Sequence, residues 1–352
     1  MDKSIILCGE KAWEVEVIRP FTMMVVVFFH ACCMMCAPVH FPDSYELYAL
    51  KYDWLTSVCL WFHMPLFIFL SGGVYGFLSN TGKYGDKVKF IKNKLQRLLL
   101  PYVCFATLFM LTTNSWSWET LFKGPGFTHL WFLLMLFWCF VVICLLREIK
   151  KVVQWSKIGD VFILFISYMG ISFPNLLPRF LGVNSFIGWF FWFYLGYVVY
   201  LHRNVVLMVI RKSVFIPLLL PLIYTMCMWI AIKNVCSDGS IMEKNILQIG
   251  YFAAVIWLWY VTCRAIDVFG NEWTRCRFIS ELSKCSFGIY IFHYWLQGFM
   301  VSRTAQRIFP LADWAANYTV LFPIAFFLLS LLISYVMTKV VLLTKMGRGL
   351  LA

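Results

Sequence analysis

The chain has 352 residues, of which 62% are apolar and only 13% are charged, and its net charge is +13. A soluble domain contains roughly 45–50% apolar and about 25% charged residues, so the composition excludes a water-soluble globular protein. The apolar residues form long runs, and a run of about 20 crosses a hydrocarbon core roughly 30 Å thick. The sequence therefore predicts an all-α, polytopic membrane helix bundle in contact with a lipid bilayer.

Ten apolar runs predict about ten transmembrane helices in chain order. The third and fifth runs are short, so their edges are the least well defined. The runs lie near residues 20–37, 54–78, 98–113, 128–146, 158–173, 185–201, 213–232, 246–262, 285–302 and 317–338.

The distribution of Lys and Arg predicts the orientation, because these residues collect in cytoplasmic loops. With the N-terminus inside, the inner segments hold 23 of the 30 basic residues and the outer segments hold 7. The sequence thus predicts that both ends are cytoplasmic, in an inner or plasma membrane. This bias accounts for most of the net charge without a nucleic-acid partner. The domain prediction is a cytoplasmic segment 1–19, a transmembrane domain 20–338 and a cytoplasmic tail 339–352.

Ionisable side chains within membrane spans are costly and mark candidate functional sites. No Asp, Glu, Lys or Arg lies well inside a predicted span, but four of the six histidines do or border one: His30, His63, His129 and His293. At about 1.5 Å per residue, His30 lies roughly 16 Å from Arg19 at the cytoplasmic edge of the first span. By the same rise, His63 and His293 lie near mid-depth, so we expect these histidines to converge.

The ninth span carries a polar stripe. Ser286, Tyr290, His293 and Gln297 are spaced four, three and four residues apart, which places them on one helical face. Such a stripe would be costly against lipid, so we expect it to face the bundle interior. In the second span, Pro65 frees a backbone carbonyl near His63, which is tolerated where protein or a cavity provides a new partner.

Five short motifs follow one another in register with these spans. They are Arg19-Pro20 with His30 separated from Arg19 by ten residues, Phe62-His63-Met64-Pro65 continuing to Gly72, Lys94-Leu-Gln-Arg97 with Pro101, His129-Leu-Trp131, and Ser286 to His293. This set, in this order, resembles the acyltransferase family 3 membrane proteins. The resemblance implies a ten-helix enzyme that moves acyl groups, most often acetyl, onto sugars of surface glycans.

The resemblance also implies roles for individual residues. His30 would be the general base on a sugar hydroxyl or a transient acyl carrier, and Arg19, Lys94 and Arg97 would hold the anionic acyl-CoA. No tightly bound cofactor or metal is implied; acetyl-CoA would be a co-substrate, with polysaccharide-biosynthesis proteins as partners. Lys94 replaces the family's usual first arginine and binds phosphate only as a point charge. The residues that would orient acceptor or thioester are His63, His129, Tyr290, His293 and Gln297.

Two readings from other classes stay open on the sequence. A transporter is one, although the lack of intramembrane carboxylates disfavours an acidic proton or sodium relay. Its soft-metal variant rests on Cys32, Cys33 and Cys36 beside two methionines, which suit Cu(I), but these sulfurs point around the whole helix. An exporter of a glycan or lipid on the same fold is the other reading, since fold does not determine function.

The predicted orientation is testable with alkaline phosphatase, which is active only outside the cytoplasm. We expect a fusion after Gly126 to be active and a fusion after Trp155 to be inactive, because these positions lie in an outer and an inner segment. The reverse pattern would contradict the orientation.

Overall fold

The computed structural model describes residues 12–36, 45–80, 84, 86–123, 128–153, 157–173, 177–213, 215–234, 241–302 and 309–351. Every regular element in these ranges is helical and none is a strand, in agreement with the predicted all-α bundle. The elements are α1 (Trp13–Met35), α2 (Tyr45–Ser57), η3 (Cys59–Phe62), α3 (His63–Asn80), α4 (Lys87–Lys94), η4 (Leu95–Leu99), α5 (Leu100–Thr112), α6 (Trp118–Phe122), η5 (Thr128–Leu130), α7 (Trp131–Val153), α8 (Lys157–Ile171), α9 (Val183–Leu201), α10 (Arg203–Lys212), α11 (Phe215–Asn234), α12 (Ile241–Phe269), η6 (Glu272–Arg275), α13 (Arg277–Met300), α15 (Leu311–Asn317), α16 (Leu321–Leu343) and α17 (Lys345–Leu351).

Each of the ten predicted apolar runs overlaps a helix. In the described part of the chain, seven helices are long and apolar enough to cross a membrane, and an eighth span results if α9 and α10, which meet at 85°, are taken as one. Helix α8 is apolar but shorter, and α13 carries charged residues in its first turns. The count of ten crossings and the cytoplasmic position of both ends stay predictions. Residues 1–11 of the predicted N-terminal segment lie outside the described residues.

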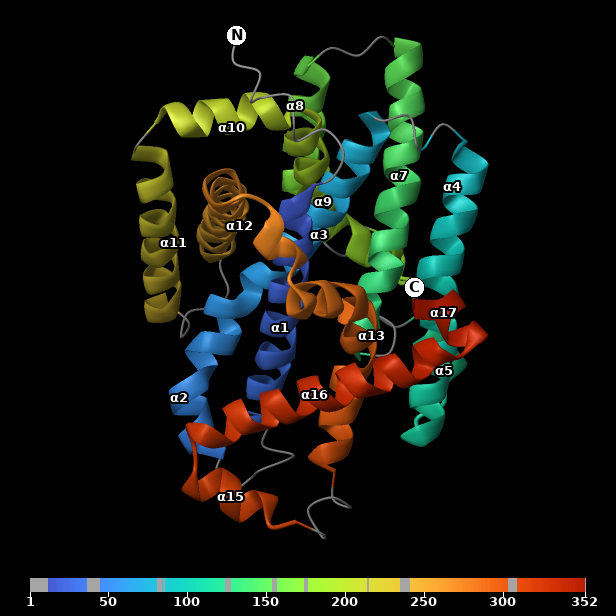
Figure 1. The fold of residues 1–352 in the computed structure, drawn as a ribbon, viewed down its shortest axis with the longest axis vertical. Helices are drawn as coiled ribbons and strands as arrows, with labels where there is room; N and C mark the ends of the chain where they lie inside the picture. The colour runs from blue at the N-terminus through green and yellow to red at the C-terminus, as the bar shows by residue number, and fades with distance from the viewer. Residues whose placement is uncertain are drawn as a thin grey trace.

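The helices are not all parallel. In Figure 1, α12 is seen nearly end-on, α10 lies across one end of the bundle between α9 and α11, and α16 crosses over α1 and α13. Helix α16 packs on both α1 and α13, and α1 also packs against α3 and α12. This arrangement encloses α1, which carries Arg19 and His30, within the bundle.

Helices α3 and α9 form the most extensive helix pair, and glycines allow their close approach. A Cβ atom added at Gly196 would lie 1.9 Å from the carbonyl oxygen of Phe69, and one added at Gly72 would lie 1.9 Å from that of Phe193. Small residues that bring backbones together are typical of helix pairs in membranes, where no hydrophobic effect drives association. The pair α3–α9 therefore forms a rigid support for the site-bearing start of α3.

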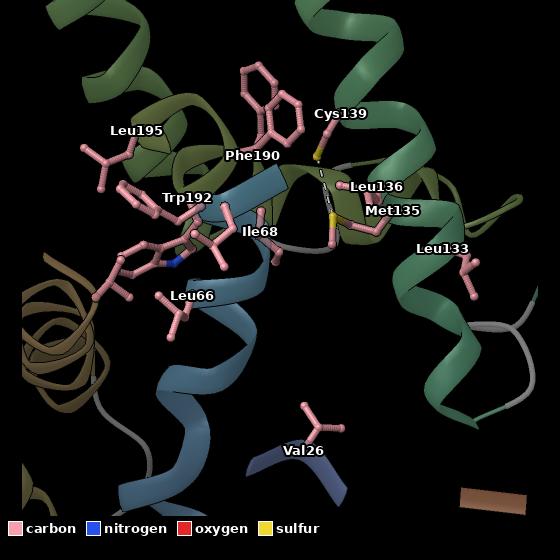
Figure 2. Close-up of a cluster of buried hydrophobic side chains, with 14 of the residues drawn as sticks. Val26, Leu66, Ile68, Leu133, Met135, Leu136, Cys139, Phe190, Trp192 and Leu195 are labelled. Carbon is pink, nitrogen blue, oxygen red and sulfur yellow. Dashed lines mark hydrogen bonds between the residues drawn. The ribbon is translucent and has the colours of Figure 1, made fainter. Parts of the chain in front are cut away.

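Apolar side chains of α3, α7 and α9 fill the space between these helices. Figure 2 shows Leu66 and Ile68 of α3 beside Trp192 of α9, with Met135 and Cys139 of α7 across the cluster. Trp192 is 1% exposed and Ile68 is fully buried. This interdigitation fixes α7 relative to α3, and the pocket described below lies beside these two helices.

The second predicted span is broken just before His63. A 3-10 turn, η3, separates α2 from α3, and the carbonyl oxygens at the break find partners on other helices. The hydroxyl of Tyr251 donates to the carbonyl oxygen of Val58 at 3.2 Å, and that of Tyr224 donates to that of Cys59 at 2.7 Å. A broken helix is tolerated at membrane depth only with such internal partners. The break sets His63 at the first position of α3.

The third predicted run begins earlier in the structure than residue 98. Elements α4, η4 and α5 form one apolar helical segment, Lys87–Thr112, because long basic side chains extend its helix into the charged stretch. Element η4 is a π-helical turn in which the N–H of Leu100 reaches the carbonyl oxygen of Leu95. Pro101 directly follows and has no N–H to donate. The widened turn contains Arg97 and follows Lys94, and π turns are frequent at functional sites.

Both ends of the described chain are fastened to the bundle. Arg203 at the start of α10 forms a two-pronged ion pair with the buried Glu14 of α1, at 3.1 and 3.2 Å. Within the predicted tail 339–352, α17 folds back so that Leu350 and Leu351 are buried. The tail residues thus contribute to the protein interior.

The α3–α9 contact makes a stability prediction. We expect Gly196→Ala to lower the stability of the protein by about 1–3 kcal/mol or more, since the added Cβ overlaps a backbone oxygen that cannot move aside. Gly298→Ala on α13 is the control, because an added Cβ there meets nothing within 4 Å. Thermal unfolding in detergent measures both, and an unchanged midpoint for Gly196→Ala would contradict the close contact.

Candidate active site

A cavity of about 570 Å³ lies beside α1, α3, α7 and α13, and residues of η4 and α17 also line it. Four basic side chains line it: Arg19, Lys94, Arg97 and Lys284. The described residues that line it include no Asp or Glu, so its potential is positive and favours anionic ligands. The three basic residues expected to hold one ligand are therefore brought together, and Lys284 joins them.

The lysine of the Lys94–Arg97 motif is held by aromatic rings. Its Nζ lies 3.7 Å from the centre of the Phe140 ring and 5.3 Å from that of Phe90. A cation over an aromatic face is attracted by the ring quadrupole. Lys94 is half-buried in this position, whereas Arg97 is exposed. The motif thus presents one oriented and one accessible cation to the cavity.

Apolar and aromatic side chains form most of the remaining wall of the cavity. Phe67, Phe132 and Leu136 line it, together with Met64, the neighbour of His63. Tyr290 of α13 also lines it, and its ring centre lies 5.3 Å from that of His129 and 5.9 Å from that of His293. Tyr290 therefore stands between the cavity and the histidines.

The membrane histidines form one cluster, made of the three that were expected to converge and of His129, for which no such prediction was made. Nε2 of His293 lies 3.1 Å from Nδ1 of His30, and the ring centres of His129 and His293 are 5.2 Å apart. His63 packs on Phe29, with ring centres 4.8 Å apart, next to His30. His293 is fully buried, and His63 and His129 are 2% and 4% exposed. Four elements of the fold, α1, α3, η5 and α13, each supply one histidine.

The hydrogen bonds define which ring nitrogens carry protons. Carbonyl oxygens only accept, so Nδ1 of His293 donates to Ile289 at 3.1 Å and its Nε2 is left with a lone pair. Nδ1 of His30 donates to the carbonyl oxygen of Val26 at 3.0 Å and shares that proton with Nε2 of His293. In this assignment Nε2 of His30 also keeps its lone pair and, within the described residues, has no hydrogen-bond partner. A histidine ring that is anchored by a hydrogen bond at one nitrogen and keeps a lone pair on the other has the arrangement of a general base.

The fourth histidine is tied to α13 at two points. Nε2 of His129 donates to the carbonyl oxygen of Ile291 at 3.0 Å, and the hydroxyl of Tyr290 donates to the carbonyl oxygen of His129. These contacts fasten η5 to α13 beside the His30–His293 pair.

The polar stripe of α13 faces the interior as expected. Ser286 and Tyr290 are each 6% exposed, and His293 and Gln297 are fully buried. Gln297 does not line the cavity: its amide donates to the carbonyl oxygen of Val27 at 3.1 Å and to Ser330 at 3.0 Å, which joins α13 to α1 and α16. Tyr290 and His293 of the stripe thus belong to the site, whereas Gln297 connects helices.

Two residues of the site were not predicted from the sequence, Tyr294 and Lys284. The ring of Tyr294 lies 4.9 Å from that of His30 and 5.1 Å from that of His129, measured between centres. Its sequence position next to His293 was the available signal, but it lies about 100° from the stripe around the helix. Lys284 was not predicted because it lies between the apolar runs 246–262 and 285–302, outside the predicted spans.

The comparisons with known proteins identify the family. The family model described as an acyltransferase domain, type 3, matches residues 13–339, nearly the whole chain. The chain belongs to the acyltransferase 3 family. No curated protein and no solved structure is significantly similar to it. The match and the apolar helices together make this chain a multi-pass membrane protein with an acyltransferase domain.

None of the cysteines in the described part of this acyltransferase lines the large cavity. Cys32 is buried, and Cys33 and Cys36 are half-buried; all three follow His30 in the chain, away from Arg19. Throughout the part of the chain that the structure describes, no three His, Cys, Asp or Glu side chains are grouped so that they would hold a metal ion.

Tyr290 should contribute to stability through its contact with His129. We expect Tyr290→Phe to cost about 0.5–1.5 kcal/mol, because it removes the buried hydrogen bond from the Tyr290 hydroxyl to the carbonyl oxygen of His129. Tyr318→Phe is the matched control, since Tyr318 is 57% exposed. Denaturation in detergent measures the two variants, and equal stability of both would refute the hydrogen bond.

Proposed function

We propose that this acyltransferase is an integral membrane O-acyltransferase of the cell membrane. It moves an acyl group, by default acetyl, from cytoplasmic acyl-CoA to a hydroxyl of a surface glycan or lipid-linked sugar. The proposal rests on one arrangement: Tyr290 lines the cationic cavity, and its ring packs against His293, which is hydrogen-bonded to His30. His30 and His293 themselves do not line the cavity. Proteins of polysaccharide biosynthesis would supply the acceptor.

The cavity suits the two ends of an acyl-CoA. The diphosphate of acyl-CoA is strongly anionic and would bind to the cations Arg19, Lys94 and Arg97. The pantetheine arm is thin and largely uncharged, which suits the apolar wall formed by Phe67 and Phe132. With the diphosphate at the cations, the thioester points toward Tyr290. The donor charges stay at the positive end while the reactive carbonyl approaches the histidines.

The histidine pair supplies the base for the transfer. Nε2 of His30 takes the proton of the acceptor hydroxyl as its oxygen forms a bond to the thioester carbonyl carbon. The carbon–sulfur bond then breaks, and the proton passes to the leaving thiolate, so that the products are an O-acyl sugar and free CoA. His293 accepts the N–H of His30 and holds that ring in place. The same nitrogen would become acylated first in the alternative relay through an acyl-histidine.

The proposal is tested with purified protein in lipid nanodiscs and radiolabelled acetyl-CoA. We expect CoA release that depends on added crude surface glycan, and a loss of at least about 10²-fold for His30→Ala, the typical contribution of a general base. His202→Ala is the matched control, because His202 lies between α9 and α10, away from the cluster.

The outcomes separate the two classes of function. Acceptor-dependent turnover that survives in His30→Ala would remove His30 from the chemistry. Neither donor binding nor turnover in the folded wild-type protein would contradict an acyltransferase and favour the exporter.

A further inference from the structure

A second, smaller cavity of about 70 Å³ adjoins the large one. The two share Tyr75 and Tyr84 as a common wall, and the rings of these tyrosines are stacked with centres 5.4 Å apart. Three basic side chains line the small cavity: Lys87 of α4, and Arg147 and Lys151 of α7. None of them belongs to the motifs singled out in the sequence.

The basic side chains of this cavity are held in place. Nη1 of Arg147 donates to the hydroxyl of Tyr75 at 3.0 Å and to that of Ser79 at 3.4 Å. The carboxylate of Glu148 pairs with Lys87 and, at 3.2 Å, with Lys151. Three cations and one carboxylate leave two surplus positive charges. A phosphate monoester carries about −1.5 to −2 at neutral pH, which matches this surplus.

We propose that the small cavity binds the 3′-phosphate of the acyl-CoA ribose, an inference that rests on the proposed function. In acyl-CoA one ribose carries both the 3′-phosphate and, at its 5′ position, the diphosphate. The two anionic groups therefore need two adjacent cationic sites, and the two cavities provide them on either side of one wall. The stacked rings of Tyr75 and Tyr84 offer the aromatic surface on which a nucleobase stacks.

The same cationic cavity would also suit a phosphate of a lipid headgroup. The donor is favoured by two observations. Tyr75 and Tyr84 line both cavities, so a ligand of the small cavity contacts the wall of the donor cavity. A phosphodiester headgroup carries a single negative charge on its phosphate and would leave one positive charge of the cavity without a partner.

The test compares binding of CoA and dephospho-CoA, which differ only in the 3′-phosphate, by calorimetry in nanodiscs of neutral phosphatidylcholine. We expect wild-type protein to bind CoA roughly tenfold more tightly, as for one charged hydrogen-bonded group. Lys87→Gln and Lys151→Gln should weaken CoA binding and leave dephospho-CoA binding unchanged, so that the ratio falls toward one. Lys92→Gln, on the exposed side of α4 and outside both cavities, should keep the full ratio.

Every other outcome overturns the inference. Equal wild-type affinity for the two ligands would do so without touching the proposed function, whereas no binding of either would contradict the proposed function itself. A ratio that persists in the Lys87→Gln, Lys151→Gln double variant would place the 3′-phosphate elsewhere. The measurement is repeated in nanodiscs that contain anionic phosphatidylglycerol. If the small cavity binds a lipid phosphate instead, Lys87→Gln and Lys151→Gln would change the affinities for CoA and dephospho-CoA equally, and only in these nanodiscs.

Discussion

Polar groups inside an apolar bundle must find their partners within the protein, and this requirement governs how α1, α3 and α13 are placed. The hydrogen bond between His30 and His293 joins α1 to α13 at 3.1 Å. Gln297 adds a second link from α13 to α1 and to Ser330 of α16. Because these bonds have no substitute in lipid, the helices that carry them cannot rotate or slide freely. The same bonds that hold the bundle also orient His30, the proposed base.

The broken second span follows the same rule. Interrupting the helix before His63 exposes carbonyl oxygens, and tyrosines of α11 and α12 donate to two of them. The break brings η3 and His63 beside α1. The membrane-embedded polar groups thus support one another around the cluster, while the charged residues Arg19, Lys94, Arg97 and Lys284 surround the cavity. The cations line the cavity, whereas the imidazoles form a separate cluster. This separation suits the proposed acyl-CoA donor, which is anionic at one end and uncharged at its thioester end.

Patterns within one helix could be predicted from the sequence. The four, three, four spacing of Ser286, Tyr290, His293 and Gln297 can be recognised without knowing which helices pack beside α13. All four side chains are buried, as expected. Arg19, Lys94 and Arg97 lie on separate elements, so their grouping could be expected only from the family resemblance. In the structure the three side chains line one cavity, which suits an anionic ligand.

Features that depend on contacts between helices could not be predicted. The steric contact of Gly196 with Phe69 determines how closely α9 approaches α3, and no local pattern encodes it. The π turn before Pro101, the break at Val58 and the inward position of α17 arise in the same way. Tyr75, Tyr84 and Arg147 come from three separate segments, so the small cavity exists only after these have packed. Hydropathy also placed the start of the third span too late, because the basic residues of α4 were counted as loop.

Delivery of an acyl group to His30 is tested most directly by an experimental density map of the His30→Ala variant in nanodiscs with bound acetyl-CoA. We expect density for the diphosphate among Arg19, Lys94 and Arg97, with the thioester beside Tyr290 and facing the position of the missing imidazole. Donor density elsewhere, or a thioester pointing away from α1 and α13, would contradict the claim that this cavity delivers an acyl group to His30.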